Sequence, residues 1–190
     1  MHRLLLLLFL PVAALAQGPP AAPAARGAEA REAELRRAFE ALEAAPDEAG
    51  AALVEARIRM LWAQSISPAV VLLLRRGSRN LEAQLPEEAS LDFDAAITLG
   101  PEVPEAWLMR AQALAGGGDA AAAARDLQEV LRLEPRHWAA LLSLSTLQEE
   151  RGDAAAALRS LNAALAINPK LRGGEVRLLE LRRKAEGDDT

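Results

Sequence analysis

A period of 34 residues runs through the second half of the chain and limits the folds that it can adopt. Endings of the form apolar-x-Pro recur at this spacing, with prolines at positions 101, 135 and 169. A Gly-Asp pair recurs at the same spacing, as Gly118-Asp119 and Gly152-Asp153, and an Ala-rich run follows each pair. Two independent markers with one period indicate tandem copies of a single structural unit. The units run from 70 to 103, from 104 to 137 and from 138 to 171.

Each unit is expected to be a pair of helices. Gly118 would end one helix, and the side chain of Asp119 would cap the next. A proline after the second helix, such as Pro135, prevents that helix from continuing. Ala, Leu, Arg and Glu are strong helix formers and dominate the chain. Only 3% of the residues are aromatic, which argues against a sheet protein. The sequence therefore predicts an all-α fold.

The unit resembles the tetratricopeptide repeat, whose small and apolar packing positions recur here in register. These structural positions are Gly77, Ala89, Phe93, Ala96 and Pro101 in the first unit, Trp107, Ala111, Ala123 and Pro135 in the second, and Ser145, Ala157, Ala164 and Pro169 in the third. The first unit departs most, because Gln84-Leu85 stands where the others have Gly-Asp. The resemblance implies a right-handed α-solenoid of helix–turn–helix units with capping helices at both ends. Trp107 and Trp138 are then core or near-core residues.

The resemblance also implies a concave groove, lined by the first helix of each unit, that holds a segment of a partner protein. The partner-groove residues would be Val71, Leu74, Ser78, Leu81, Glu105, Leu108, Gln112, Leu142, Thr146 and Glu149. This groove would be mildly apolar, with acidic and amide edges. It lacks the Lys and Asn residues of the carboxylate clamp in chaperone-binding members of the family, so capture of an acidic C-terminal peptide in that manner is not expected.

Two arginines, Arg76 and Arg110, fall at the same position of successive units, where the family usually has a Leu. Stacked arginines could bind a carboxylate or a phosphate in a bidentate manner. They could equally pair with internal acids such as Glu82 or Glu105. Internal pairing is the preferred interpretation.

The segments that flank the units are expected to be helical caps. Residues 28–67 are predicted to form an N-terminal capping hairpin or a degenerate repeat, with a break at Pro46-Asp47. Residues 172–186 are predicted to form a C-terminal capping helix. A solenoid needs such caps, because no unit buries its apolar face alone.

The first residues have the pattern of an export signal. A short basic start precedes an apolar run that ends Ala14-Leu15-Ala16, the small-x-small pattern of a cleavage site. Residues 1–16 are therefore predicted to be a signal peptide that is cleaved after Ala16, and an uncleaved membrane anchor is the rival interpretation. Residues 17–27, rich in Pro and Ala, are predicted to be a flexible linker. The mature chain would be periplasmic, with an extracellular location as the alternative, and would not insert into a membrane.

Charge and composition exclude several functions. A formal net charge of −5 does not favour nucleic acid as a partner. The chain has no Cys, and after signal removal it keeps a single His, His137, which is expected to be a surface or turn residue. A Ser-His-Asp triad or a metal site cannot be assembled with confidence from one His. We therefore expect no catalytic residue, no cofactor and no metal.

The expected function is that of a non-enzymatic scaffold or adaptor in the bacterial periplasm, which binds a protein partner of unknown identity. Two alternatives stay open at this point. The chain could be a structural envelope protein that self-associates as a homodimer. It could also be an accessory subunit of an envelope enzyme complex.

Overall fold

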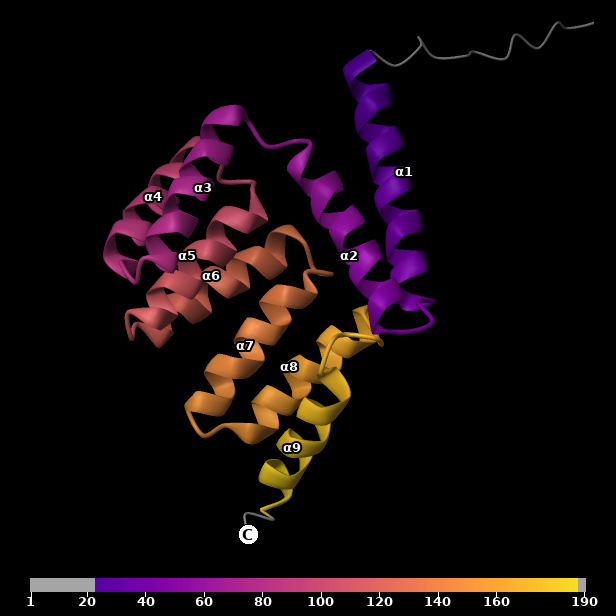
Figure 1. Ribbon diagram of the computed structural model, residues 1–190, viewed down its shortest axis with the longest axis vertical. Helices are drawn as coiled ribbons and strands as arrows, with labels where there is room; N and C mark the ends of the chain where they lie inside the picture. The colour runs from indigo at the N-terminus through magenta and orange to yellow at the C-terminus, as the bar shows by residue number, and fades with distance from the viewer. Residues whose placement is uncertain (1–22, 188–190) are drawn as a thin grey trace, which may run out of the picture.

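The computed structural model describes residues 23–187, which form nine α-helices and no strand. The helices are α1 (Pro23–Glu43), α2 (Glu48–Ala63), α3 (Pro68–Glu82), α4 (Pro86–Leu99), α5 (Pro104–Gly116), α6 (Ala120–Leu133), α7 (Trp138–Glu150), α8 (Ala154–Ile167) and α9 (Gly174–Glu186). Three hairpins, α3–α4, α5–α6 and α7–α8, stack one on the next, and α9 packs on α8 (Figure 1). The predicted all-α fold of stacked helix pairs is confirmed.

The Gly-Asp pairs make the tight turns inside the second and third hairpins. Gly118 and Gly152 have φ values of +88° and +78°, a left-handed conformation that costs glycine little. The side chains of Asp119 and Asp153 then cap the following helices. Each accepts a hydrogen bond from the backbone N–H three residues later, at 2.9 and 2.8 Å. These pairs fix where one helix ends and the next begins.

The first hairpin makes the same turn with less suitable residues. Gln84 takes the left-handed position, with a φ of 59°, and is the only described residue other than glycine with a positive φ. Leu85, at the position of Asp119, offers no side-chain hydrogen bond to the start of α4. The backbone path of the repeat is therefore kept although its usual turn residues are absent.

The hairpin interiors are packed by the small and apolar repeat positions. Gly77, Ala89, Phe93, Ala96, Ala111, Ala123, Ser145, Ala157 and Ala164 are all buried. Ser145 donates its hydroxyl hydrogen to the carbonyl oxygen of Ala157 at 2.9 Å, which satisfies this buried polar group. Trp107 is half-buried, and its Nε1 donates to the carbonyl oxygen of Pro101 at 2.9 Å. The repeat prolines, Pro101, Pro135 and Pro169, are exposed just after each hairpin.

The N-terminal hairpin, α1–α2, packs against the third unit (Figure 1). Its apolar core continues into Trp138, Ala164 and Leu171. Asn168 Nδ2 donates to Glu55 Oε1 at 2.7 Å, and the N–H of Gly173 donates to Glu48 at 3.1 Å. Within residues 23–187, α2 and α3 do not pack along each other. The expected helical hairpin with its break at Pro46-Asp47 is present as α1 and α2. Its apolar side chains find their partners at the third unit.

The first unit consequently has an open end. Ala106 and Ala140, the third residues of the second and third units, are fully buried against the preceding unit. The matching residue of the first unit, Leu72, has 64% of its surface exposed. The side of α3 that carries Leu72 is thus an end of the stack that no other described helix covers.

Helix α1 begins earlier than expected. It starts at Pro23, inside the segment 17–27 that was expected to be a flexible linker. That expectation is wrong for 23–27, because proline is tolerated in the first turn of a helix, where its missing N–H would have no helical partner. Residues 17–22 and the expected signal peptide, 1–16, lie outside the described residues.

Candidate functional site

A groove opens between α2 and the first helices of two units. It has a volume of about 300 Å³. Four of the predicted partner-groove residues line it, namely Val71, Leu74 and Ser78 from α3 and Glu105 from α5. Its other lining residues are Arg59, Trp62 and Ala63 of α2, Ile66 of the connection, Arg75 of α3 and Met109 of α5. We call this the α2 groove.

The α2 groove has an apolar floor and charged edges. The edges carry Arg59 and Arg75 in addition to Glu105. Arg59 is held by Glu55, one turn earlier on α2, at 3.1 Å. The sequence predicted acidic and amide edges alone. The basic side chain of Arg59 was not predicted, because α2 lies outside the repeats.

A second depression of about 320 Å³ lies between α5 and α7. Two further predicted groove residues, Gln112 and Thr146, line it, together with Ala115 and Glu150. The six predicted residues that line a groove are thus divided between two sites.

The other predicted groove residues lie elsewhere. Leu81 is half-buried against the core of the first unit. Leu108 is only 4% exposed, because the small neighbours Ala111 and Ala140 let α5 and α7 approach closely around it. Its assignment as a partner-facing residue is therefore wrong.

The third unit contributes less to a groove than expected. Leu142 is half-buried against the core of the N-terminal hairpin and against the α8–α9 core. Glu149 accepts hydrogen bonds from Arg177 at 3.0 Å and from Lys184 at 2.7 Å. Both residues are thus engaged inside the fold, because α1–α2 and α9 pack around α7 and α8. Their assignment to an open groove is wrong.

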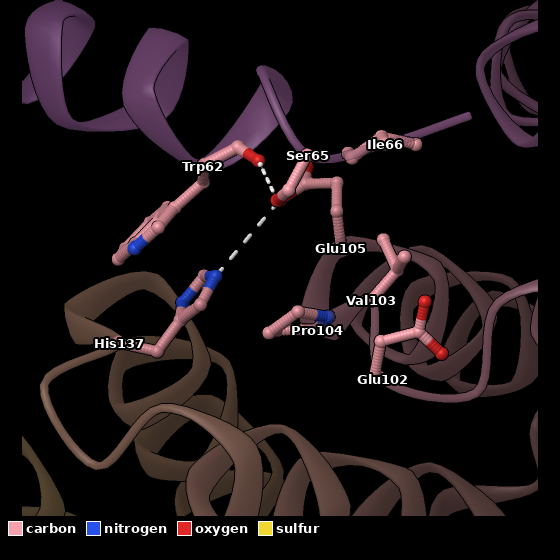
Figure 2. A pocket seen from close by; sticks show the side chains of 8 residues that line it. All are labelled: Trp62, Ser65, Ile66, Glu102, Val103, Pro104, Glu105 and His137. Carbon is pink, nitrogen blue, oxygen red and sulfur yellow. Dashed lines mark hydrogen bonds and ion pairs between the residues drawn. The ribbon is translucent and has the colours of Figure 1, made fainter. Parts of the chain in front are cut away.

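A partly open cavity of about 120 Å³ adjoins the α2 groove. Trp62, Ile66 and Glu105 line both, so the two spaces share these residues as a common border. The cavity is completed by Ser65, Glu102, Val103, Pro104 and His137 (Figure 2). We call it the His137 cavity.

His137 lies in the turn between two units, as expected, but it is buried in an aromatic cluster and does not lie on the surface. Its ring stacks on Trp62 with the centroids 4.7 Å apart and an interplanar angle of 14°. Trp62 also stacks on Trp138 at 5.5 Å, and Phe39 meets Trp138 edge-on at 6.2 Å. His137 Nδ1 accepts the N–H of Ala140 at 3.3 Å and so caps α7. Its place immediately before Trp138, at a helix start, was a signal that sequence reasoning missed.

The two repeat-position arginines form internal ion pairs. Arg76 bonds to Asp92, which also accepts from Asn80 at 2.9 Å. Arg110 donates to both carboxylate oxygens of Asp126 at 2.7 Å. Internal pairing was the preferred interpretation, but the acids are the aspartates of the second helix of each hairpin and not Glu82 or Glu105.

These ion pairs make the arginines unsuitable as a free anion site. Arg110 also bonds to Asp94, at 2.6 Å. The Asp126 hydrogen bond raises the pKa of Arg110 above its ordinary value, since it stabilises the charged guanidinium. Each arginine thus joins the two helices of its hairpin. Arg110 also joins two successive units.

Two negative findings concern residues 23–187. No group of three or more His, Cys, Asp or Glu side chains in this range could hold a metal ion. No helix in the described range is both long enough and apolar enough to cross a membrane.

The repeat geometry agrees with a known family. A model of the tetratricopeptide repeat matches residues 74–124 and 108–171, which together make up just over half of the chain. The chain belongs to the tetratricopeptide repeat (TPR) family. A TPR repeat-containing protein of Rhizobium etli is 34% identical over 103 residues, which are 54% of this chain and 49% of the relative. The chain thus spans about half the length of this curated relative.

Solved structures show the same fold. The first TPR domain of Spaghetti (RPAP3), bound to an HSP90 peptide, superposes with a TM-score of 0.58 at 16% identity, covering 62% of this chain and 93% of that one. The TPR2B domain of yeast Sti1, in a complex with pHsp70, gives 0.58 at 22% identity, with 64% and 99% covered. The chaperone SycD of Yersinia enterocolitica, with a peptide of the translocator YopD, gives 0.55 at 15% identity, with 64% and 92% covered. TPR domains are in general non-catalytic modules of protein interaction.

Proposed function

We propose that this TPR protein is a non-enzymatic adaptor that holds a segment of another protein in the α2 groove. The observation that carries the proposal is the groove itself, which has an apolar floor and charged edges of both signs. An extended peptide can bury alternate apolar side chains on such a floor and keep its polar groups at the edges. Related folds support this use, since RPAP3 is bound to an HSP90 peptide and SycD to a peptide of YopD in solved structures.

We also propose that the adaptor works in the bacterial periplasm. The support is the basic start, the apolar run and the Ala14-Leu15-Ala16 ending within residues 1–16. Fractionation of the native host and N-terminal sequencing of the mature chain test this point. Gln17 is the expected first residue. A mature chain that still begins at Met1 in the cytoplasm would overturn the location without touching the groove.

Site-directed photo-crosslinking in cells tests the groove. A photoreactive residue at Val71, on the groove floor, should capture a partner, whereas the same residue at Leu91, exposed on α4 outside the groove, should not. The captured segment, made as a synthetic peptide, should bind the purified chain. It should lose at least about tenfold in affinity on Ser78→Arg, which fills the groove. Equal capture at both positions would show that the groove is not the binding surface.

The open end of the first unit favours a second candidate, self-association. Leu72 is exposed there at a position that is buried in the other units, and exposed apolar surface at a repeat end can pair with another chain. Light scattering after size exclusion decides the matter. A dimer that Leu72→Glu converts to a monomer would support self-association, and a wild-type monomer at high concentration would exclude it.

A further inference from the structure

His137 presents a buried hydrogen-bond donor that has no acceptor. Because Nδ1 accepts the N–H of Ala140, the hydrogen of the neutral ring lies on Nε2. The side chain is 3% exposed, and Nε2 has no hydrogen-bond partner in the described structure. Glu105 Oε2, at 3.8 Å, is too far away to accept. Figure 2 shows Nε2 directed into the His137 cavity, toward Glu105 and Ser65.

The cavity is large enough for a chemical group of a ligand. Its volume of about 120 Å³ corresponds to about four water molecules of liquid. Trp62, Ile66, Val103 and Pro104 provide apolar walls. An unmatched buried donor is costly, because it has given up its hydrogen bonds to water. A ligand that supplies the acceptor therefore gains both a hydrogen bond and contact with these walls.

The charges at the cavity select the type of acceptor. The Glu105 carboxylate faces the same space as His137 Nε2, and Glu102 lies at the rim with its carboxylate turned away (Figure 2). A ligand carboxylate would satisfy Nε2 but would be repelled by Glu105. A ligand ammonium would pair with Glu105 but would leave the Nε2 hydrogen unmatched. A neutral group with both an acceptor and a donor satisfies both residues.

We propose that the His137 cavity binds the side-chain carboxamide of a Gln or Asn residue in the partner segment. The carboxamide oxygen accepts the hydrogen of His137 Nε2, and its NH₂ group donates to Glu105. The rest of the segment lies in the α2 groove, which borders the cavity at Trp62 and Ile66. This site rests on the proposed function, since it is the specificity pocket of the same groove.

Selection of a random peptide library on the full mature chain tests the pocket. We expect the selected peptides to share one Gln or Asn beside apolar residues. Changing that Gln to Glu in a selected peptide should weaken binding at least about tenfold, because a carboxylate meets Glu105 and loses the donor. His137→Asn should weaken binding of the parent peptide to a similar extent. Asn still caps α7 but is too short to reach the cavity.

A variant of the chain should reverse this selectivity. Glu105→Gln replaces the acceptor by an amide of equal size, so the Glu-containing peptide should bind as well as the Gln peptide or better. Glu102→Gln is the matched control and should keep the preference for Gln, since its carboxylate points away from His137. Loss of selectivity in Glu105→Gln alone cannot come from general unfolding, because the parent peptide would still bind.

The outcomes separate the pocket from the adaptor function. The selected peptides could bind in the α2 groove and compete with one another but share no Gln or Asn position. This result would overturn the carboxamide pocket and leave the adaptor function intact. In that case water fills the cavity. A screen from which no peptide binds wild-type chain would overturn both. Equal preference for Gln and Glu peptides in the wild-type chain would also overturn the pocket.

Discussion

Gly77 lies directly against the ring of Phe93, so closely that a Cβ atom on Gly77 would stand 2.6 Å from Cζ of Phe93. The same two repeat positions are occupied by Ala111 and Leu127 in the second unit, and by Ser145 and Leu161 in the third. The smallest residue on the first helix thus accompanies the largest residue on the second. The pair sets how closely the two helices of a hairpin approach.

Gly77→Ala should therefore destabilise the chain, although alanine is the better helix former. An added methyl group at an interior site forces the Phe93 ring to move, and overpacking of this kind costs about 1–3 kcal/mol. Gly116→Ala is the control, since nothing lies within 4 Å of its added Cβ and the change should be neutral or stabilising. Urea unfolding measures both. A Gly77→Ala chain as stable as wild type would show that the ring is free to move.

The double variant Gly77→Ala with Phe93→Leu reproduces the pair of the second unit. It should recover part of the stability that each single change removes. The coupling in this double-mutant cycle should be at least about 0.5 kcal/mol, as is usual for residues in contact. Additive effects would mean that the two positions do not set the hairpin spacing.

The packing inside each hairpin could be predicted from the sequence, because its partners lie close along the chain and recur with the period. Gly77 and Phe93 are an example. The placement of α1–α2 could not be predicted in this way. It depends on the stacking of Trp62 on His137, two residues far apart in sequence that no repeat relates. The wall that α2 contributes to the groove and the His137 cavity went unpredicted for the same reason.

Leu108 and Val71 illustrate a second limit of the sequence. Both were assigned to the groove by their repeat positions, but Leu108 is enclosed between α5 and α7, whereas Val71 lines the α2 groove. Leu108→Asp should place a charge in a closed core and abolish the cooperative thermal transition. Val71→Asp should keep the helical circular dichroism and most of the melting temperature. A folded Leu108→Asp chain would mean that α5 and α7 can separate there.

Arg110 should contribute more to stability than an exposed arginine with an equally good partner. Its side chain is 21% exposed and bonds to Asp94 and to Asp126, which is 7% exposed. Arg110→Gln leaves Asp126 buried without its cation, and we expect a loss of about 1–2 kcal/mol. Arg132, 65% exposed beside Glu129, is the control, and Arg132→Gln should change the unfolding midpoint little. Equal losses would show that the repeat ion pair has no special role.

Trp62 should hold the N-terminal hairpin on the third unit. Trp62→Ala removes the stacking on His137 and Trp138. The amides of α1 and α2 should then exchange at least about tenfold faster, which corresponds to ~1.4 kcal/mol of lost local stability. Exchange in α4 and α6 should be unchanged. Met60→Ala, on an exposed part of the same helix, is the control. Unchanged exchange in both variants would show that other contacts fix the hairpin.

The turn of the first hairpin can be improved by the residues that the other hairpins use. Gln84→Gly removes the strain of a left-handed residue with a side chain, and Leu85→Ser adds the missing cap at the start of α4. Serine is preferred to aspartate because Glu87 and Glu88 already place negative charge in that turn. Together the changes should raise the free energy of unfolding by about 1–2 kcal/mol. Leu85→Ala adds no hydrogen-bond acceptor, so it should not reproduce the gain in stability from Leu85→Ser. Gly118→Gln should lower the free energy of unfolding, because it places a side chain at the left-handed position of the second hairpin. If Gly118→Gln costs nothing, the left-handed turn is not a source of strain in this fold.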